Sequence, residues 1–131
     1  MNLRDSISAA RVSGPEAGPD GTTTFTFCFP ASDPTFSGHF PTRPLLPGVF
    51  QLELARFAAE LMVHQPLALR AITKAKFLRP IIPEETIRVE LKLTEKADML
   101  QVRASFSVTG QAAGETILQV TRNTGSGLKK S

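Results

Sequence analysis

Residues 48–63 favour a long α-helix, and they constrain the fold of this chain more than any other segment. A helix without a broad polar face has to be enclosed on most of its sides. In a small protein the simplest enclosing surface is a curved β-sheet. We therefore expect a sheet wrapped around one central helix. The apolar residues that point in almost every direction from this helix are Val49, Phe50, Leu52, Leu54, Ala55, Phe57, Ala58, Ala59, Leu61 and Met62.

Most of the remaining chain favours β-strands, which supports this architecture. Apolar and polar residues alternate with a period of two along residues 22–29 and 86–93, which is typical of half-buried strands. Strands are also predicted at residues 67–77, 100–108 and 115–122.

The N-terminal residues give a weaker pattern. Residues 6–12 alternate slightly and predict a short first strand, and the Gly, Pro and Asp residues of 13–21 predict a turn. The predicted class is α+β: two strands, the buried helix, and then three to four antiparallel strands in a meander. Such a sheet has unpaired edges, so a dimer or larger homo-oligomer is expected.

The bulk properties restrict the class of protein. A chain of 131 residues is expected to form one domain over residues 1–131, with the polar residues 123–131 as a disordered tail. No apolar run approaches the roughly 20 residues that span a bilayer, and Arg4 and Asp5 precede any apolar stretch, unlike a signal peptide. Cys28 is the only cysteine, so no internal disulfide can form. We expect a cytoplasmic protein without membrane association.

Composition also argues against two kinds of partner. The net charge is +3, but the chain has no Trp or Tyr and no basic cluster mixed with aromatic residues, so nucleic acid is not an expected partner. Two histidines and one cysteine make no plausible metal cluster, and no glycine-rich phosphate loop is present. No metal or cofactor is therefore expected.

The segment before the helix has the composition of an acid–base site. His39 is followed by Pro41, Pro44 and Pro47, which are spaced three residues apart. Prolines fix the backbone in extended conformations, so His39 is expected on a stiff, non-helical arm. Gly48 then opens the helix, and Glu53 follows about 7.5 Å further along its axis. An imidazole, free helix N–H groups and a carboxylate can thus converge.

This segment resembles the signature of the 3-hydroxyacyl-[acyl carrier protein] dehydratases of hotdog fold. The resemblance covers roughly residues 20–110. A second similarity is the run 76–83, Lys-Phe-Leu-Arg-Pro-Ile-Ile-Pro, which is like the family's link into a strand. The residues that carry the first similarity are Phe36-Ser37-Gly38-His39-Phe40-Pro41, Pro44, Pro47-Gly48-Val49 and Glu53, with the carboxylate fourteen positions after the histidine.

The resemblance implies a reaction and a role for each site residue. His39 would remove the C2 proton of a 3-hydroxyacyl thioester, since the pKa of histidine lies near neutral pH. Glu53 would be protonated, or share a proton with the substrate hydroxyl through a hydrogen bond, and so help the C3 hydroxyl leave as water; burial in an apolar helix face should raise its pKa toward this role. The backbone N–H of Gly48 would bind the thioester oxygen at the helix N-terminus.

The resemblance also implies partners. In this family the histidine and carboxylate of one site come from different subunits, so activity would require a homodimer or higher homo-oligomer. An acyl carrier protein would deliver the substrate, and its acidic surface could contact Arg43, Lys74, Lys76 and Arg79.

Two features depart from the family pattern. The chain is short at its N-terminus, and Glu53 is followed by Leu54-Ala55-Arg56-Phe57, where housekeeping members have small residues and a glutamine. Both indicate a specialised relative that serves a secondary lipid, polyketide or aryl-polyene pathway. A hotdog thioesterase and a non-catalytic acyl-binding or assembly subunit remain as alternatives.

Ordinary structural roles also account for several of these residues. Glu53, Arg56 and Glu60 lie at positions i, i+3 and i+7, which on a surface helix form a solvated stripe with weak ion pairs. His64, at the end of the helix, is expected to interact with the helix dipole only. The phenylalanines are expected in the core, although Phe50, Leu54 and Phe57 could line an acyl tunnel.

Overall fold

The computed structural model describes residues 3–30 and 48–122, including two α-helices and six strands. The arm that carries His39 and the tail 123–131 lie outside the described residues. The elements in chain order are α1 (Leu3–Ala10), β1 (Arg11–Ala17), a 3-10 turn η1 (Pro19–Gly21), β2 (Thr23–Cys28), α2 (Gly48–Val63), β3 (Leu67–Phe77), β4 (Thr86–Lys96), β5 (Met99–Val108) and β6 (Gln111–Arg122).

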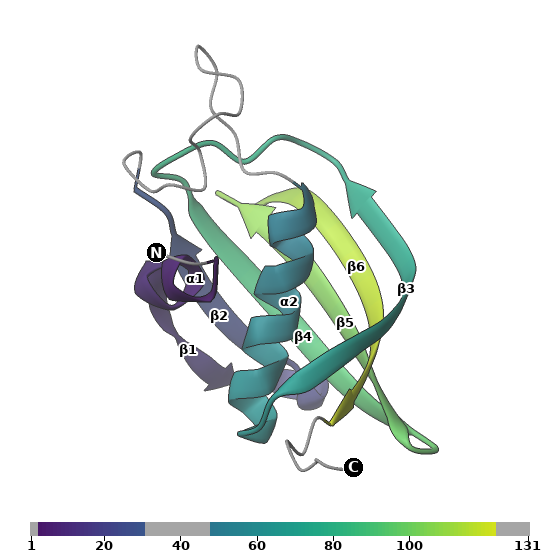
Figure 1. Cartoon of the computed structure of the whole chain (residues 1–131). Helices are drawn as coiled ribbons and strands as arrows, with labels where there is room; N and C mark the ends of the chain where they lie inside the picture. The colour runs from purple at the N-terminus through teal and green to yellow at the C-terminus, as the bar shows by residue number, and fades with distance from the viewer. Residues whose placement is uncertain (1–2, 31–47, 123–131) are drawn as a thin grey trace.

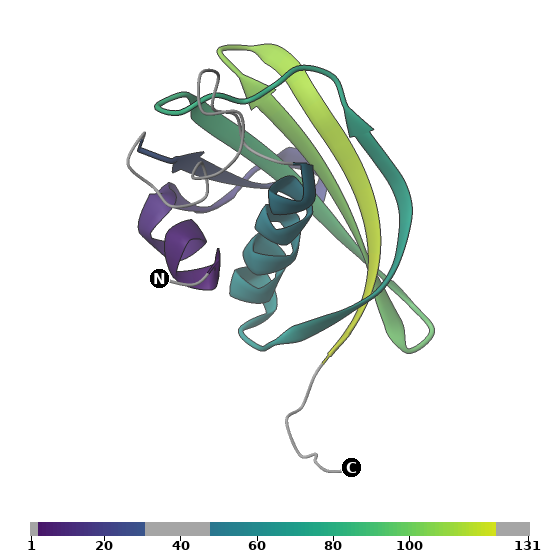
Figure 2. The same ribbon diagram turned by 45° about the horizontal axis from the view of Figure 1, so that its top comes forward.

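The six strands form one antiparallel sheet that curves around α2 (Figures 1 and 2). The strand order is β1-β2-β4-β5-β6-β3. The predicted α+β class is therefore confirmed, with a curved sheet wrapped around one long helix in the hotdog arrangement. The bounds of α2 and β3 also agree with the predicted segments 48–63 and 67–77.

The position of β3 differs from the predicted meander. β4, β5 and β6 do form a meander, but β3 lies at the far edge of the sheet and pairs with β6 rather than with β4. α2 lies across the concave face of the sheet (Figure 1), and both of its ends lie beside β3. Its first residue, Gly48, lies against Phe77 at the end of β3, and Glu60 near its last turn accepts from the N–H of Leu67 at the start of β3. The strands β4 to β6 then fill the sheet between β2 and β3.

The N-terminal predictions were wrong in two respects. Residues 3–10 form helix α1 rather than the start of a strand, and the buried residues Ile7 and Ala10 are spaced three apart, as one helix face requires. Residues 13–17 belong to β1 rather than to a turn. β1 tolerates Gly14 and Pro15 because it is an edge strand whose pairing with β2 is irregular at this point.

The core lies between the concave face of the sheet and α2. Phe25, Phe27 and Phe29 are buried, and the intervening Thr24, Thr26 and Cys28 are only half-buried, as their alternation predicted. On α2 the buried apolar residues are Leu54, Ala55, Ala58 and Ala59. α1 packs beside α2 on the side of β1 and β2 (Figure 2). Neither described helix is long and apolar enough to cross a membrane.

Candidate active site

The N-terminus of α2 is the centre of the candidate site, and Gly48 is its first residue. The first N–H groups of an α-helix have no partner within the helix, so they can bind a partial negative charge. Gly48 also has a packing role that the sequence did not predict. A Cβ at this position would lie 2.9 Å from two ring atoms of Phe77 on β3, so a side chain here would require the half-exposed ring to move. The role of Gly48 in thioester binding stays a prediction.

Glu53 lies on α2 as predicted, but its surroundings are not the apolar ones expected from the sequence. Its side chain is about one quarter exposed, and it forms an ion pair with Arg56 one turn later. Nε of Arg56 donates to Oε2 of Glu53 at 3.0 Å, and a second guanidinium nitrogen donates to Oε1. This two-point contact fixes the orientation of the carboxylate as well as its position.

Arg56 and Glu60 also join α2 to the first residue of β3. A nitrogen of the guanidinium donates to the backbone carbonyl of Leu67 at 3.0 Å, and Oε2 of Glu60 accepts from the N–H of Leu67 at 2.8 Å. Glu60 is 7% exposed, so the alternative of a solvated stripe at positions 53, 56 and 60 is wrong for Glu60. These side chains are instead a partly buried network at the turn between helix and strand.

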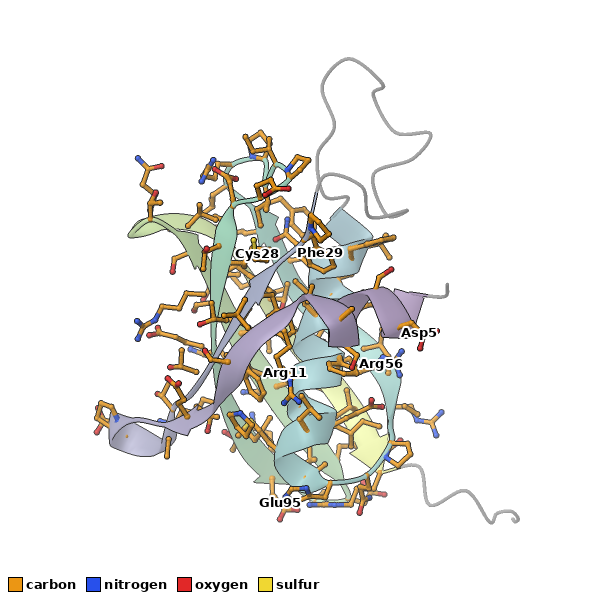
Figure 3. All side chains as sticks on the ribbon, turned by 90° about the vertical axis from the view of Figure 1, so that its left-hand side faces the viewer. Asp5, Arg11, Cys28, Phe29, Arg56 and Glu95 are labelled. Atoms are coloured by element: carbon orange, nitrogen blue, oxygen red, sulfur yellow. The ribbon has the colours of Figure 1, made fainter. Side chains whose placement is uncertain are left out.

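Electrostatics agree with this network. The hydrogen bond to Glu53 raises the pKa of Arg56 above its ordinary value, although partial burial of the guanidinium acts against this. The negative charge of nearby Glu60 adds to the effect. Arg56 is thus a fixed cation, and Figure 3 labels it where α2 passes behind α1.

Gln51 is a buried polar residue that sequence reasoning missed. It is 2% exposed on the sheet side of α2, and its Oε1 has no hydrogen-bond partner among the described residues. This oxygen lies against Gly114 of β6, where an added Cβ would be only 2.8 Å away. The sequence signal was a glutamine at a core-facing position of an otherwise apolar helix. Gly114 was expected to precede the last strand, but that strand begins at Gln111.

The second motif, residues 76–83, links β3 to β4 and begins near the N-terminus of α2, since Phe77 lies against Gly48. Ile81 is buried in the core, whereas Phe77, Leu78 and Ile82 are exposed. Burial alone would raise the pKa of Glu85, but hydrogen bonds from the N–H of Ile82 and from Arg79 hold it below its ordinary value.

The basic residues expected to contact a carrier protein differ in their surroundings. Arg79 pairs with Glu85 at 2.7 Å, and Lys74 pairs with Glu115 at 2.9 Å. Lys76 is exposed on β3. Arg43 and His39 lie outside the described residues. Two of the predicted carrier contacts therefore already have carboxylate partners within this chain.

The other residues singled out in the sequence have structural roles. His64 ends α2 in the left-handed conformation, with φ 60°, and its N–H donates to the carbonyl of Glu60 at 2.8 Å. This is the geometry of a helix C-terminal cap. Leu54 is fully buried, and Phe50 and Phe57 are partly buried against the same core. Within residues 3–30 and 48–122, no group of His, Cys, Asp and Glu is arranged to hold a metal ion.

Comparison with solved structures supports the fold. The chain superposes on the dehydratase heterocomplex ApeI:P from Xenorhabdus doucetiae with a TM-score of 0.71 and 24% identity, covering 86% of this chain and 96% of that one. It also superposes on the PaaI protein of the Escherichia coli phenylacetic acid degradation operon, with a TM-score of 0.65 and 16% identity, covering 91% and 89% of the two chains. These low identities show a shared fold only.

Sequence comparison adds the family. The chain is 33% identical over 93 residues to the 3-hydroxyacyl-[acyl-carrier-protein] dehydratase FabZ of Solibacter usitatus, covering 64% of this chain and 57% of that protein. It is 34% identical over 95 residues to FabZ of Granulibacter bethesdensis, covering 65% and 56%. The matches span less than two thirds of these relatives. A profile of the ApeI-like family, described as ApeI dehydratase, matches residues 16–116. The chain therefore belongs to the ApeI-like family of hotdog-fold dehydratases.

Proposed function

We propose that this protein eliminates water from 3-hydroxyacyl thioesters carried on an acyl carrier protein, giving trans-2-enoyl thioesters. The observation that carries the proposal is the spacing of His39, Gly48 and Glu53 in a chain that belongs to a dehydratase family. The helix begins at Gly48 and presents Glu53 about one and a half turns later, in the half-buried position that a group in contact with substrate requires.

The proposed chemistry divides the elimination among these residues. The imidazole of His39 removes the C2 proton, and the N–H of Gly48 stabilises the negative charge that develops on the thioester oxygen. The carboxyl group of Glu53, in its protonated form, donates its proton to the C3 hydroxyl as the C3–O bond breaks, so that water leaves. The proton taken from C2 then lies on His39, and its return to Glu53 restores both groups for the next turnover. The ion pair with Arg56 has a consequence for this step, because a proton can pass between Glu53 and the substrate only where the guanidinium leaves an oxygen lone pair accessible.

We further propose that two copies associate along the β3 edge. β3 has eleven residues and, among the described strands, pairs with β6 alone, within a sheet whose other edge is β1. Its exposed apolar side chains include Leu69, Ile72 and Phe77, which are 38%, 46% and 50% exposed. A long exposed edge strand with apolar residues favours pairing with another chain. A second copy at this edge would lie next to the N-terminus of α2, since Phe77 packs on Gly48.

The acyl group and pathway belong to this proposal as well. The Arg56-Phe57 pair after Glu53 differs from the usual family pattern, and the ApeI-like match supports a specialised relative. A secondary lipid, polyketide or aryl-polyene pathway fits both observations. The related structure from Xenorhabdus doucetiae is a heterocomplex, so the native assembly of this chain has to be measured before its partner is assigned.

One experiment tests the activity against its alternatives. The protein is incubated with a carrier-bound 3-hydroxyacyl thioester and, separately, with the matching trans-2-enoyl thioester. A dehydratase interconverts the two, a thioesterase releases free thiol, and a non-catalytic binding subunit does neither. Size-exclusion chromatography with light scattering on the same sample measures the oligomeric state, and a monomer with full activity would refute a site shared between subunits.

Substitutions then test the residues. His39→Ala and Glu53→Gln are each expected to abolish interconversion while leaving the circular dichroism spectrum unchanged. His64→Asn and Glu95→Gln are matched controls, because His64 caps the far end of α2 and Glu95 is 71% exposed on the β4–β5 hairpin (Figure 3). Wild-type turnover in either His39→Ala or Glu53→Gln would defeat the assignment.

A further inference from the structure

We propose that Arg56 is a positioning residue, which holds the carboxylate of Glu53 in one orientation from a fixed anchor at the start of β3. The inference rests on the proposed role of Glu53 in the dehydratase reaction. It concerns a residue at which this chain departs from the usual family pattern, where small residues follow the glutamate.

The guanidinium of Arg56 contacts two different parts of the protein. One side of its planar fork donates to both oxygens of Glu53. The remaining nitrogen donates to the carbonyl of Leu67 at 3.0 Å and lies 3.7 Å from Oε2 of Glu60. Because the guanidinium is planar and rigid, holding one side fixes the direction of the other.

The anchor is well buried. Leu67 is 1% exposed and begins β3, where it pairs with Arg122 of β6. Its carbonyl is bound by Arg56, and its N–H is bound by Glu60, which is itself 7% exposed. Both polar backbone groups of Leu67 are therefore held by α2. The position of the Glu53 carboxylate is in this way tied to the sheet as well as to its own helix.

A purely structural role does not account for the contact with Glu53. The contacts of Arg56 and Glu60 with Leu67 already join helix to strand, and a pair with side chains 25% and 24% exposed contributes little to stability. A glutamate without this partner samples several rotamers. Catalysis needs its reacting group in a narrow range of positions, and a misplacement of about 1 Å can cost roughly 100-fold in rate.

The test compares Arg56→Ala, Arg56→Lys and Glu53→Gln in the carrier-bound enoyl hydration assay, with Arg88→Ala as the matched control. Arg88 also pairs with a glutamate, Glu90, but on the exposed surface of β4. We expect Arg56→Ala to lower kcat by roughly 10- to 100-fold with little change in KM, since the substrate still binds. Arg56→Lys should recover part of the loss, because an ammonium can pair with one carboxylate oxygen.

Chemical rescue separates positioning from a structural effect. Millimolar methylguanidine should raise kcat of Arg56→Ala and leave Arg88→Ala and Glu53→Gln unchanged, because only the first variant has an unoccupied guanidinium position beside Glu53. No rescue, together with equal losses in the Ala and Lys variants, would show that Arg56 acts only as a tether and overturn the inference.

The result also distinguishes the two proposals. Wild-type kcat in Arg56→Ala, with Glu53→Gln inactive, refutes positioning and leaves the dehydratase proposal intact. Full activity of Glu53→Gln removes the role of Glu53 and this inference with it. Absence of interconversion by the wild-type protein refutes the proposed function itself.

Discussion

Gly114→Ala tests the packing beneath α2 most directly. Gly114 lies in β6 opposite Phe77 of β3, and the side chain of Gln51 lies against it from α2. An added Cβ would be 2.8 Å from Oε1 of Gln51 and 2.9 Å from the carbonyl oxygen of Lys76. Ordinary contact begins near 3.4 Å, so the two groups must retreat by about 0.6 and 0.5 Å.

The two neighbours differ in how easily they can move. The Gln51 oxygen makes no hydrogen bond within residues 3–30 and 48–122, so its side chain can rotate without breaking one there. The Lys76 carbonyl belongs to the backbone of β3, which is paired with β6, and it can move only if the strands separate locally. Overpacking of this kind costs about 1–3 kcal/mol. For 131 residues this corresponds to a fall in Tm of about 4–11 °C, at about 2.1 cal/mol/K per residue.

The assay is thermal and urea unfolding followed by circular dichroism at one protein concentration, since an oligomer's Tm depends on concentration. Gly48→Ala is the first control, because its Cβ would meet only the half-exposed ring of Phe77, which can swing away. Gly18→Ala is the second, because its nearest neighbour would be 3.4 Å away. We expect losses below about 1 kcal/mol and about 0.5 kcal/mol, respectively.

A double substitution tests which neighbour dominates. Gln51→Ala in the Gly114→Ala background should recover only part of the lost stability, because the contact with the Lys76 carbonyl remains. Full recovery would show that the side chain, and not the backbone, limits the space. A Gly114→Ala protein as stable as Gly18→Ala would refute the close packing of β3 and β6 at this point.

Three further predictions follow from buried or paired polar groups. Gln51→Met should raise the free energy of unfolding by about 1 kcal/mol in urea titrations, because at similar volume it removes a buried oxygen that has no partner in the described part of the chain; a lower free energy of unfolding would mean that the amide oxygen is hydrogen-bonded in the folded protein. Glu60→Ala should lower it by about 2–3 kcal/mol, because the buried N–H of Leu67 loses a charged acceptor, whereas Glu60→Gln should lose less than half of that. The lowered pKa of Glu85 makes its ionised form stabilising above 4.5, its ordinary value, and this contribution is lost as the pH falls through the lower folded-state pKa. The Tm difference between wild type and Glu85→Gln should therefore shrink in acid, and a constant difference from pH 7 to 3 would contradict the pairing with Arg79.

The regular parts of the fold could be predicted because their signals are local. Alternation with period two fixes which face of β4 is buried, and Ile87, Val89 and Leu91 are indeed buried. The bounds of α2 follow from the apolar run and from the His64-Gln65-Pro66 stop. What these patterns cannot fix is the order of strands, because the alternation within β3 does not determine whether it pairs with β4 or with β6.

The wrong predictions have one physical origin, which is that a short local pattern can fit two different structures. α1 is only eight residues long, and its buried spacing of Ile7 and Ala10 is easily confused with weak alternation. In β1, Gly14 and Pro15 are turn residues in most contexts, and an irregular edge strand accommodates them. The positions of Glu53, Arg56 and Glu60 suit a solvated stripe as well as a buried network. Only the turn into β3, which supplies Leu67, decides between them.

The two faces of α2 explain how the helix can depart from its family without losing the fold. Its sheet side carries the small residues Ala55, Ala58 and Ala59, all fully buried, which let the helix lie close against the strands. Arg56 lies on the opposite side with Glu53 and Glu60, so a bulky cation there displaces nothing in the core. The substitution of a small residue by Arg56 therefore changes the surroundings of the proposed catalytic carboxylate and little else. If this chain is specialised for a particular acyl group, we expect a substitution of Arg56 to change kcat, through the carboxylate of Glu53, more than it changes the free energy of unfolding.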